Sequence, residues 1–481
     1  MTDILSIGKS GLGASKKSME VAGHNVANAN TEGYSRQRVK QTTGVPITKD
    51  GLVMGSGARV HGVERIDAKH IEQRLAGAIT SHEYNHERLE QLEQVESIFN
   101  ETESEGLNKI VNKFFNSFRD LANQPENETM RSVVRDNAKL IVKDFNRIRS
   151  TLDELARGVD KRLEREMVNI NQISNHLADI NKKITNIEAL GGESGDLRDQ
   201  RDVAIRSLAE YFDVSTYTDN KNHFIVNAEG VGTIISATEV QELAVKGQPL
   251  ETSPNGMSGA VEIYFKNRPS GFISDKFANG KLASLLKVRN VDLRKMQTDI
   301  DQVAYTLTKS VNAIHSKGFI YKPGISIEGE NAGEYTNVNF FKDLSSSENA
   351  STEMSLSDEV QEDLANIVTA LAPNAPGDNR IALAISKLEN AKLMAEGTST
   401  IEDQYLKSIG HVGVQTGKAR VDTEQSEGLL AQTRAIKERI TGVSIDEEAA
   451  NMIKFQHAYE ASAKVLKAAD DMFQVVLGIK R

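Results

Sequence analysis

The sequence predicts a mainly α-helical protein with a β-rich insertion, built as an elongated helical bundle or coiled coil in which the N- and C-terminal helices pair. Three observations predict this fold. Both ends of the 481-residue chain carry apolar residues at alternating spacings of three and four, which is the pattern of a coiled-coil seam. Long stretches between the ends, such as 128–190, contain almost no helix-breaking residue. Only residues 212–273 are rich in the β-branched and aromatic residues that favour strands.

The last predicted helix covers residues 444–479 and has a single apolar stripe. Charged side chains occupy its other faces, and Ser444 with Glu447 fits a capping box at its start. Such a helix has to bury its stripe against another helix, in this chain or in a neighbouring one. The seam residues of this helix that we expect to act in assembly are Met452, Phe455, Tyr459, Leu466, Phe473 and Val476.

The first helix, predicted over residues 5–29, shows the same alternation. Small residues fill one row of its seam, which would let a second helix approach closely. The simplest account pairs this helix with the C-terminal one, and the alternative is that each is an ordinary amphipathic helix packed on a globular body. The larger seam residues of this helix that we expect to act in assembly are Leu5, Leu12, Met19 and Val26.

Glycine and proline divide the chain between these ends into further elements. Residues 28–38 are predicted to form a turn in which Gly33 takes a left-handed backbone conformation, and 39–63 to form short strands. A loop is expected over 318–357. Helices are expected over residues 66–99, 107–123, 128–190, 196–211, 281–315, 381–396 and 400–441.

The elements group into a domain plan. Residues 1–36 and 441–481 are expected to form a terminal coiled-coil domain. Residues 37–211 and 274–440 are expected to form an elongated, mainly helical domain, into which the β-rich subdomain 212–273 is inserted.

Composition excludes several classes of function. The chain contains no cysteine, so disulfides and thiolate chemistry are excluded. A net charge of −10 without a dense Lys/Arg block argues against nucleic acid as a partner. An apolar run of about 18 residues, as a membrane-spanning helix requires, is absent from the sequence. Because the N-terminus does not match a cleaved signal peptide, we expect a cytosolic protein or one that leaves the cell by another route.

One short motif resembles a catalytic site. His82, Glu83 and His86 match the H-E-x-x-H pattern of zinc proteases, which places two imidazoles on one helix face beside a general base. A third ligand would be required, and Glu103 and Glu105 are at a tolerable distance in sequence. The residues that flank the motif are polar or charged, whereas the motif helix of such proteases is buried. A solvated helix face is therefore the favoured interpretation.

Several stretches of the sequence resemble bacterial flagellar rod, hook and hook-associated proteins. Residues 11–39 are similar to the N-terminal motif that these proteins share, and Tyr34-Ser35-Arg36-Gln37 within them is similar to the version found in hook-associated proteins of the hook–filament junction. Residues 442–461 resemble the ending typical of the family. Internal likenesses lie at 197–203 and 279–318, so the resemblance covers nearly the whole chain in the correct order.

The resemblance implies a structural protein and not an enzyme, with no catalytic residue, metal or cofactor. Its role would be that of an adaptor ring at the hook–filament junction, located in the extracellular flagellum. The chain would be exported unfolded without a cleaved signal peptide and would assemble through its terminal helices. The implied partners are further copies of the chain, the hook protein, the next hook-associated junction protein, and a cytoplasmic export chaperone at the C-terminal helix. Nucleic acid and membrane are not among them.

Many members of the family carry a sizeable β-domain for which this sequence has little room. Residues 342–375 are largely polar and are expected to be a reduced variable outer segment.

Two alternatives to the junction protein remain. One is a hook or rod protein of the same superfamily, and the other is a zinc metalloprotease that uses His82, Glu83 and His86.

Overall fold

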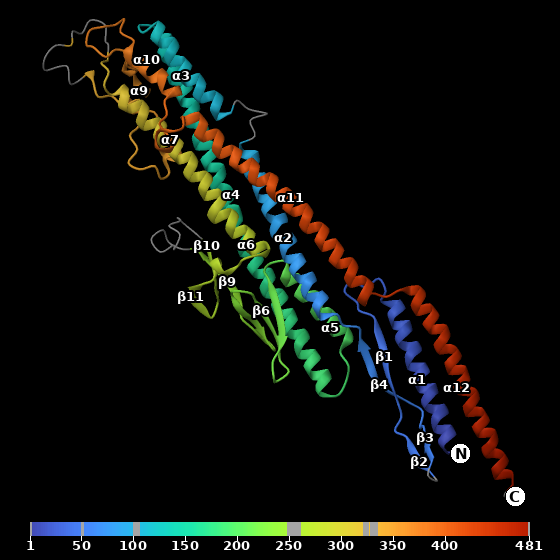
Figure 1. Ribbon diagram of the computed structural model, residues 1–481. Helices are drawn as coiled ribbons and strands as arrows, with labels where there is room; N and C mark the ends of the chain where they lie inside the picture. The colour runs from blue at the N-terminus through green and yellow to red at the C-terminus, as the bar shows by residue number, and fades with distance from the viewer. Residues whose placement is uncertain are drawn as a thin grey trace. The chain divides into compact units, whose positions relative to one another are not determined.

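A computed structural model of the protein describes residues 2–49, 52–99, 106–247, 261–320, 327 and 335–479. The chain divides into two units, each of which is built from separate stretches of sequence (Figure 1). The first unit contains Met1–Tyr84, Glu164–Ala283 and Glu424–Arg481, and the second contains Asn85–Leu163 and Ser284–Thr423. The helices that contribute residues to both units are α2 (Lys69–Ile98), α4 (Glu128–Ala189), α6 (Gly280–Lys287) and α11 (Ile401–Thr441).

The first unit contains both ends of the chain. Helices α1 (Thr2–Ala27) and α12 (Ile445–Ile479) pack against each other along their lengths (Figure 1), which confirms the predicted pairing of the terminal helices. Helix α1 also lies on an antiparallel pair of strands, β1 (Gln37–Thr43) and β4 (Ala58–Arg65). The strands between them in sequence, which pair with each other, are β2 (Ile47–Lys49) and β3 (Leu52–Met54).

The predicted β-rich insertion is also confirmed and belongs to the first unit. It follows α5 (Gly195–Ala209) and forms two small antiparallel sheets. The first sheet has the strand order β5 (Val214–Thr218), β6 (Phe224–Ala228), β7 (Gly232–Ser236) and β8 (Glu239–Val240). The second sheet has β10 (Val261–Phe265) between β9 (Leu243–Gly247) and β11 (Arg268–Phe272).

The second unit is helical and has an aromatic core. Helix α6 continues through a π-helical turn, Val288–Leu293, into α7 (Arg294–His315), as the uninterrupted pattern predicts. The edges of Phe114 and Phe118 on one helix meet Phe340, with ring centroids 5.7 and 5.5 Å apart. The remaining helices of this unit are α3 (Leu107–Asn123), α8 (Ala350–Glu353), α9 (Asp358–Glu362) and α10 (Arg380–Ser386).

The prediction of one helix over residues 381–396 is wrong for the second half of that range. Helix α10 ends at Ser386, and the chain continues in short 3₁₀ turns. Ala395 and Glu396 have positive φ angles of 48° and 58°, which a right-handed helix cannot accommodate. Met394 is buried and its N–H bonds back to the Ser399 carbonyl, so a tertiary contact of this turn overrides the helix-forming composition of the segment.

Residues 342–375, all of which the structure describes, contain α8, α9 and a 3₁₀ turn at Leu364–Asn366, and no β-barrel. Phe341 and Leu356 form an isolated β-bridge at the start of this stretch. None of the helices in the described part of the chain combines the length and the apolar composition that crossing a bilayer requires.

His315, at the end of α7, joins two loops in the core of the second unit. Its ring is fully buried and lies against Phe340, with centroids 5.3 Å apart. Nδ1 is 2.7 Å from the Val338 carbonyl oxygen, and Nε2 accepts the Val368 N–H at 3.1 Å. This arrangement assigns the proton to Nδ1. Burial lowers the pKa of His315 to about 4, with a smaller effect in the same direction from Arg131 and an opposing one from the Val338 carbonyl.

We predict that His315 makes the second unit sensitive to mild acid. The folded pKa lies below the ordinary value of 6.5, so the unfolded chain binds the proton more readily. The contribution of the neutral ring is fully present above pH 6.5 and is lost as the pH falls from 6.5 to about 4, by about 3 kcal/mol in all. Urea unfolding between pH 4 and 7 should therefore show a steeper loss of stability for the wild type than for His315→Gln. His457→Gln, at an exposed position, should keep the steep profile.

Candidate functional site

The contact between the terminal helices depends on small residues of α1. A Cβ atom added to Gly8 would lie 3.5 Å from the side chain of Leu466, and one added to Gly11 would lie 2.8 Å from the Ser462 hydroxyl. The second distance is shorter than a normal contact, so α12 approaches more closely than an alanine at Gly11 would permit. The row of small residues on α1 therefore allows a second helix to pack closely, as the sequence indicated.

The terminal pair covers the predicted seam only in part. On α1, Leu5, Leu12, Met19 and Val26 are half-buried. On α12, Phe455, Tyr459 and Leu466 are half-buried, whereas Met452 and Phe473 are 38% and 45% exposed. Val476 lies within α12, but its side chain is outside the described set.

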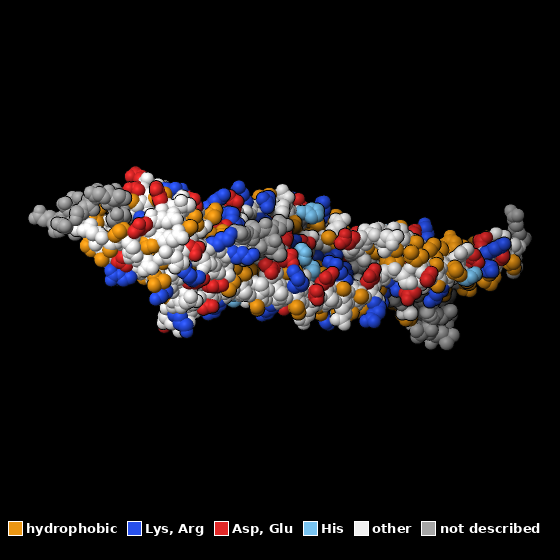
Figure 2. All heavy atoms as spheres, turned by 90° about the horizontal axis from the view of Figure 1, so that it is seen from above, with side chains coloured by type: hydrophobic (Ala, Val, Ile, Leu, Met, Phe, Trp, Pro, Cys, Tyr) orange, Lys and Arg blue, Asp and Glu red, His pale blue; other side chains and the backbone are white. Residues whose placement is uncertain are grey.

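Helix α12 therefore keeps a large apolar surface in the single chain. Only Glu448 and Ala469 are buried among the described side chains of this helix. Figure 2 shows hydrophobic side chains gathered over the terminal helices, at the right of the view. The large apolar residues of α12 that remain exposed are Ile445, Met452, Ile453, Val465, Met472, Phe473, Val475 and Leu477.

A buried ion pair fixes the start of α12. The Glu448 side chain is 3% exposed, and its Oε1 accepts from Arg36 Nε at 2.7 Å and from Arg36 Nη2 at 2.6 Å. Its other oxygen accepts from Asn25 Nδ2 at 3.2 Å, and Asn25 is in the last turn of α1. Arg36 also donates its backbone N–H at 2.8 Å to the carbonyl of Thr441, the last residue of α11. We call Asn25, Tyr34, Arg36 and Glu448 the clasp.

Tyr34 completes the clasp from the loop after α1. Its hydroxyl donates to Asn25 Oδ1 at 2.8 Å and lies 3.0 Å from His24 Nδ1. Gly33, which precedes it, has φ +80°, and this confirms the left-handed turn predicted there. Burial raises the pKa of Tyr34, and the nearby carboxylates of Asp196, Asp199 and Glu448 raise it further. Tyr34 therefore remains a neutral donor at physiological pH and is unsuited to act as a base.

A second pair of charges anchors the same loop to α5. The Ser35 N–H donates to Asp199 Oδ2 at 3.0 Å, and Arg65 Nη1 donates to Asp199 Oδ1 at 2.9 Å and to Asp202 Oδ2 at 2.7 Å. Burial raises the pKa of Asp199, against the opposing effect of Ser35 and Arg65. These bonds join the loop after α1, the end of β4 and α5 within the first unit.

Sequence reasoning missed the clasp as an interaction, although it noticed most of the residues involved. The stretch around Tyr34 and Arg36 was singled out for its family likeness, and Glu448 lies in the other matching stretch. Arg36 and Glu448 are 412 positions apart, and a single sequence carries no signal that joins them. The Glu447 N–H lies 3.4 Å from Ser444 Oγ, so the predicted N-cap forms, but the Glu447 side chain pairs with Arg36 instead of closing a capping box.

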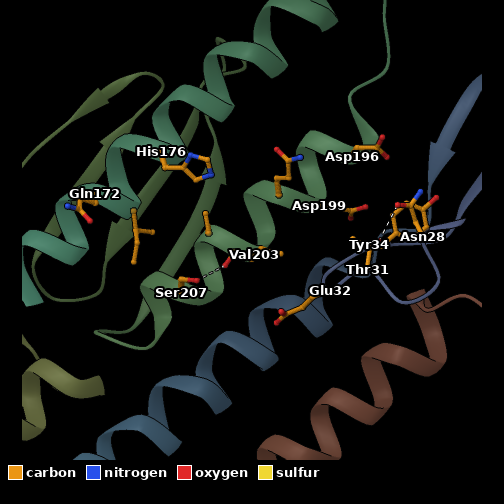
Figure 3. Close-up of a pocket in the computed structure, with 13 residues that line it drawn as sticks. Asn28, Thr31, Glu32, Tyr34, Gln172, His176, Asp196, Asp199, Val203 and Ser207 are labelled. Atoms are coloured by element: carbon orange, nitrogen blue, oxygen red, sulfur yellow. Dashed lines mark hydrogen bonds between the residues drawn. The ribbon is translucent and has the colours of Figure 1, made fainter. Parts of the chain in front are cut away.

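A pocket of about 650 Å³ lies beside the clasp, between the loop after α1 and helices α4 and α5 (Figure 3). Thr31 and Glu32 line one side, and Gln172 and His176 of α4 line another. The lining is mainly apolar, with carboxylates and amides at its edge. Tyr34, which also lines the pocket, is held as a hydrogen-bond donor within the clasp.

The H-E-x-x-H residues lie on α2, where the motif was expected. Glu83, which would have to act as the general base, pairs with Lys281 Nζ at 3.2 Å, and Lys281 also bonds Glu210 at 2.8 Å. Within the described ranges, no group of three or more His, Asp or Glu side chains is arranged to hold a metal ion. Glu103 and Glu105, the candidates for a third ligand, lie outside the described residues. Glu83 is thus an ion-pair partner in this fold.

Comparison with known proteins agrees with this geometry. Residues 92–330 match the family described as "Flagellar hook-associated protein FlgK helical domain", and residues 439–479 match "Flagellar basal body rod FlgEFG protein C-terminal". The chain is 27% identical to "Flagellar hook-associated protein 1" of Bacillus subtilis (strain 168) over 98% of this chain and 97% of that one. It is 22% identical to the protein of the same name from Escherichia coli (strain K12) over 100% of both chains.

A solved structure shows the same fold. The flagellar hook junction protein FlgK from Burkholderia pseudomallei superimposes with a TM-score of 0.64 at 13% identity, covering 77% of this chain and 100% of that one. The chain is thus similar to flagellar hook-associated protein 1 over essentially its full length, and residues 92–330 match the helical domain described for that protein.

Proposed function

We propose that the chain is a structural adaptor at the junction between the hook and the filament of the bacterial flagellum, and that it assembles as a ring through its terminal helices. The likeness to hook-associated proteins over the whole chain supports the flagellar role. The observation that carries the assembly mechanism is the apolar surface of α12, which remains exposed after α12 has paired with α1. A surface of this kind on an otherwise polar helix indicates a contact with another molecule.

Neighbouring copies of the chain would bury the apolar surface of α12 that α1 leaves exposed. Each apolar side chain that becomes fully buried contributes about 1.5–3 kcal/mol, and this gain has to exceed the entropy lost on ordering the subunits. Met452, Ile453 and Phe473 are all more than one-third exposed, so each has area left to bury. The predicted seam residues thus divide into two groups, with Leu466 holding α1 to α12 and Phe473 facing the neighbours.

The domain plan follows from this division. We propose that residues 1–36 and 441–481 form the assembly domain, with 37–211 and 274–440 as the helical body. The β-rich subdomain 212–273 would be an insertion into that body. We further propose that residues 342–375, with their short helices, replace a larger outer domain.

The same surface suggests the partners of the chain. Before assembly, the exposed apolar surface of α12 would have to be shielded from water. An export chaperone that binds this helix in the cytoplasm would shield it. After export of the unfolded chain through the flagellum, the hook protein on one side and the next hook-associated protein on the other would contact the ring. The absence of cysteine suits a chain that has to remain unlinked during such passage.

A hook or rod protein of the same superfamily is the second candidate. The match of residues 439–479 to the rod-protein C-terminal family favours it. That match covers α12 and the end of α11, which an assembly domain shared across the superfamily would also explain. The match at 92–330 favours the junction protein, because that model describes the helical domain of the hook-associated protein FlgK. A strain that lacks this chain separates the candidates: loss of filament from a complete hook indicates the junction, and loss of the hook itself indicates the rod or hook.

We predict that two substitutions on α12 separate pairing from assembly. Leu466→Asp places a charge against Gly8 of α1, so it should loosen the terminal pair and prevent incorporation into flagella. Phe473→Asp changes an exposed side chain, so it should alter the stability of the free subunit by less than about 0.5 kcal/mol but still prevent incorporation. Incorporation is measured by complementation of a deletion strain, and stability by unfolding of the purified chain.

Lys467→Asp is the matched control, because it introduces the same carboxylate beside Leu466 on the exposed face. It should assemble normally. The proposal fails if Phe473→Asp and Leu466→Asp both support normal filaments at wild-type expression.

We predict that the clasp holds the two terminal helices in place. Glu448→Gln removes the buried carboxylate that Arg36 and Asn25 contact, which should destabilise the first unit by about 1–3 kcal/mol because Arg36 loses its buried charged partner and keeps only the exposed Glu447. Hydrogen exchange should become faster in the last turn of α1 and the first turns of α12, with α3 unchanged. Glu447→Gln alters the neighbouring carboxylate, which also pairs with Arg36 but is 63% exposed, and should have little effect. Equal exchange in both variants would contradict this role.

A further inference from the structure

A small pocket in the first unit gathers more positive than negative charge. It has a volume of about 170 Å³, which is far more than the roughly 15 Å³ that one water molecule needs. The start of α2, helix α5 and strands β5 and β6 contribute to its lining. The residues that carry the argument are Arg65, Arg198, Arg201, Arg206, Thr216 and Thr218.

Three of the four arginines already have carboxylate partners. Arg65 bonds Asp199 and Asp202, as described above. Arg206 bonds Glu72 at 2.8 Å, and Arg198 bonds Glu188 at 2.7 Å. The charges of these side chains are therefore compensated within the fold.

Arg201 differs from them. Its Cζ lies 3.8 Å from the centre of the Phe224 ring, so one face of the guanidinium is covered by an aromatic side chain. Its Nε is buried, and in the described part of the chain no acceptor lies within hydrogen-bond distance of it. Burial lowers the pKa of Arg201 to about 10, Asp202 opposes this effect, and repulsion from Arg198 and Arg65 adds to it.

The Arg201 side chain is only partly exposed, and its buried Nε–H lacks an acceptor, which is unfavourable. Asp67, Glu72 and Asp202 also line the pocket, but they are bonded to Arg65 or Arg206. The pocket therefore favours a further negatively charged group beside Arg201. A guanidinium presents its N–H groups as a planar fork that matches the oxygens of a phosphate or a carboxylate. The threonines of β5 that line the pocket add hydroxyl donors.

We propose that this pocket is a binding site for a small oxyanion, of the phosphate or carboxylate type, with Arg201 as its principal ligand. The anion comes from one of two sources. It is either a free ion such as inorganic phosphate, or an acidic side chain of a neighbouring copy that inserts on assembly. The LRDQRD stretch at residues 197–202 therefore has two roles, since Asp199 anchors the loop after α1 and Arg201 receives the anion.

The test uses the full chain and inorganic phosphate at constant ionic strength, with chloride as the reference anion. Calorimetric titration should show saturable phosphate binding to the wild type, together with a rise in the unfolding temperature. Arg201→Met keeps the apolar stem and removes the charge, so phosphate should bind it at least about tenfold more weakly. Without phosphate, this variant should be as stable as the wild type or more stable, because the uncompensated charge is gone.

Arg434→Met is the control for the loss of one positive charge, because Arg434 is exposed on α11 in the same unit and does not line the pocket. It should bind phosphate as the wild type does. The proposal is overturned if phosphate gives no binding beyond that seen with chloride, or if Arg201→Met binds phosphate with unchanged affinity.

Addition of phosphate to the assembled polymer, meaning the ring of copies in the proposed function on which this step rests, separates the two sources. Phosphate that binds the dilute chain and leaves the polymer intact identifies a free anion as the occupant. Phosphate that binds the dilute chain and also dissociates the polymer identifies an acidic side chain of a neighbouring copy. Both outcomes support the oxyanion site, and absence of binding to the dilute chain contradicts it.

Discussion

The carboxylate of Glu448 is the group on which the arrangement of the terminal helices depends. It is almost completely buried, so it is tolerable only while Arg36 and Asn25 remain bonded to it. Asn25 belongs to helix α1, and Arg36 belongs to the loop between α1 and β1, so both lie at the other end of the chain. Because a buried charge restricts the geometry of its partners far more than an apolar contact does, the clasp fixes where α12 begins relative to α1. Apolar packing along the two helices then needs only to be approximately complementary.

Small residues on α1 determine what remains for other molecules. Gly8 and Gly11 let α12 approach closely, so the pair is narrow and contacts along a limited strip. The larger apolar side chains of α12 are left at the rim of this strip or beyond it. A bulkier first helix would cover a different part of α12. The choice of glycine thus reserves apolar area for contacts between subunits, at the expense of about 1 kcal/mol of helix propensity for each glycine.

Elements with a strong local pattern could be predicted from the sequence. The terminal helices, the long helix of residues 128–189 and the β-rich insertion follow from periodicity and composition, and the structure has them. The second half of the helix expected over 381–396 failed, because the conformation of Ala395 and Glu396 is set by a tertiary contact of Met394. The apolar stripes of the two terminal helices could be predicted from the sequence, but the hydrogen bonds and ion pair of the clasp could not. Arg36 and Glu448 are joined only by folding, and the partial exposure of Phe473 depends on how closely α1 approaches.

Polar and apolar interactions are divided between two tasks in the first unit. Directional bonds, from Arg36 to Glu448 and from Arg65 to Asp199, fix the geometry of each subunit, and they form between groups of the same chain. The surface that we propose for assembly is apolar, so its contacts would be non-directional and would tolerate small shifts between neighbours. The proposed ring between two structures of different lattice would require both a rigid subunit and adaptable contacts. If the directional ion pairs lay between subunits and the apolar contacts lay within them, any misfit between neighbouring subunits would leave a buried charge unpaired.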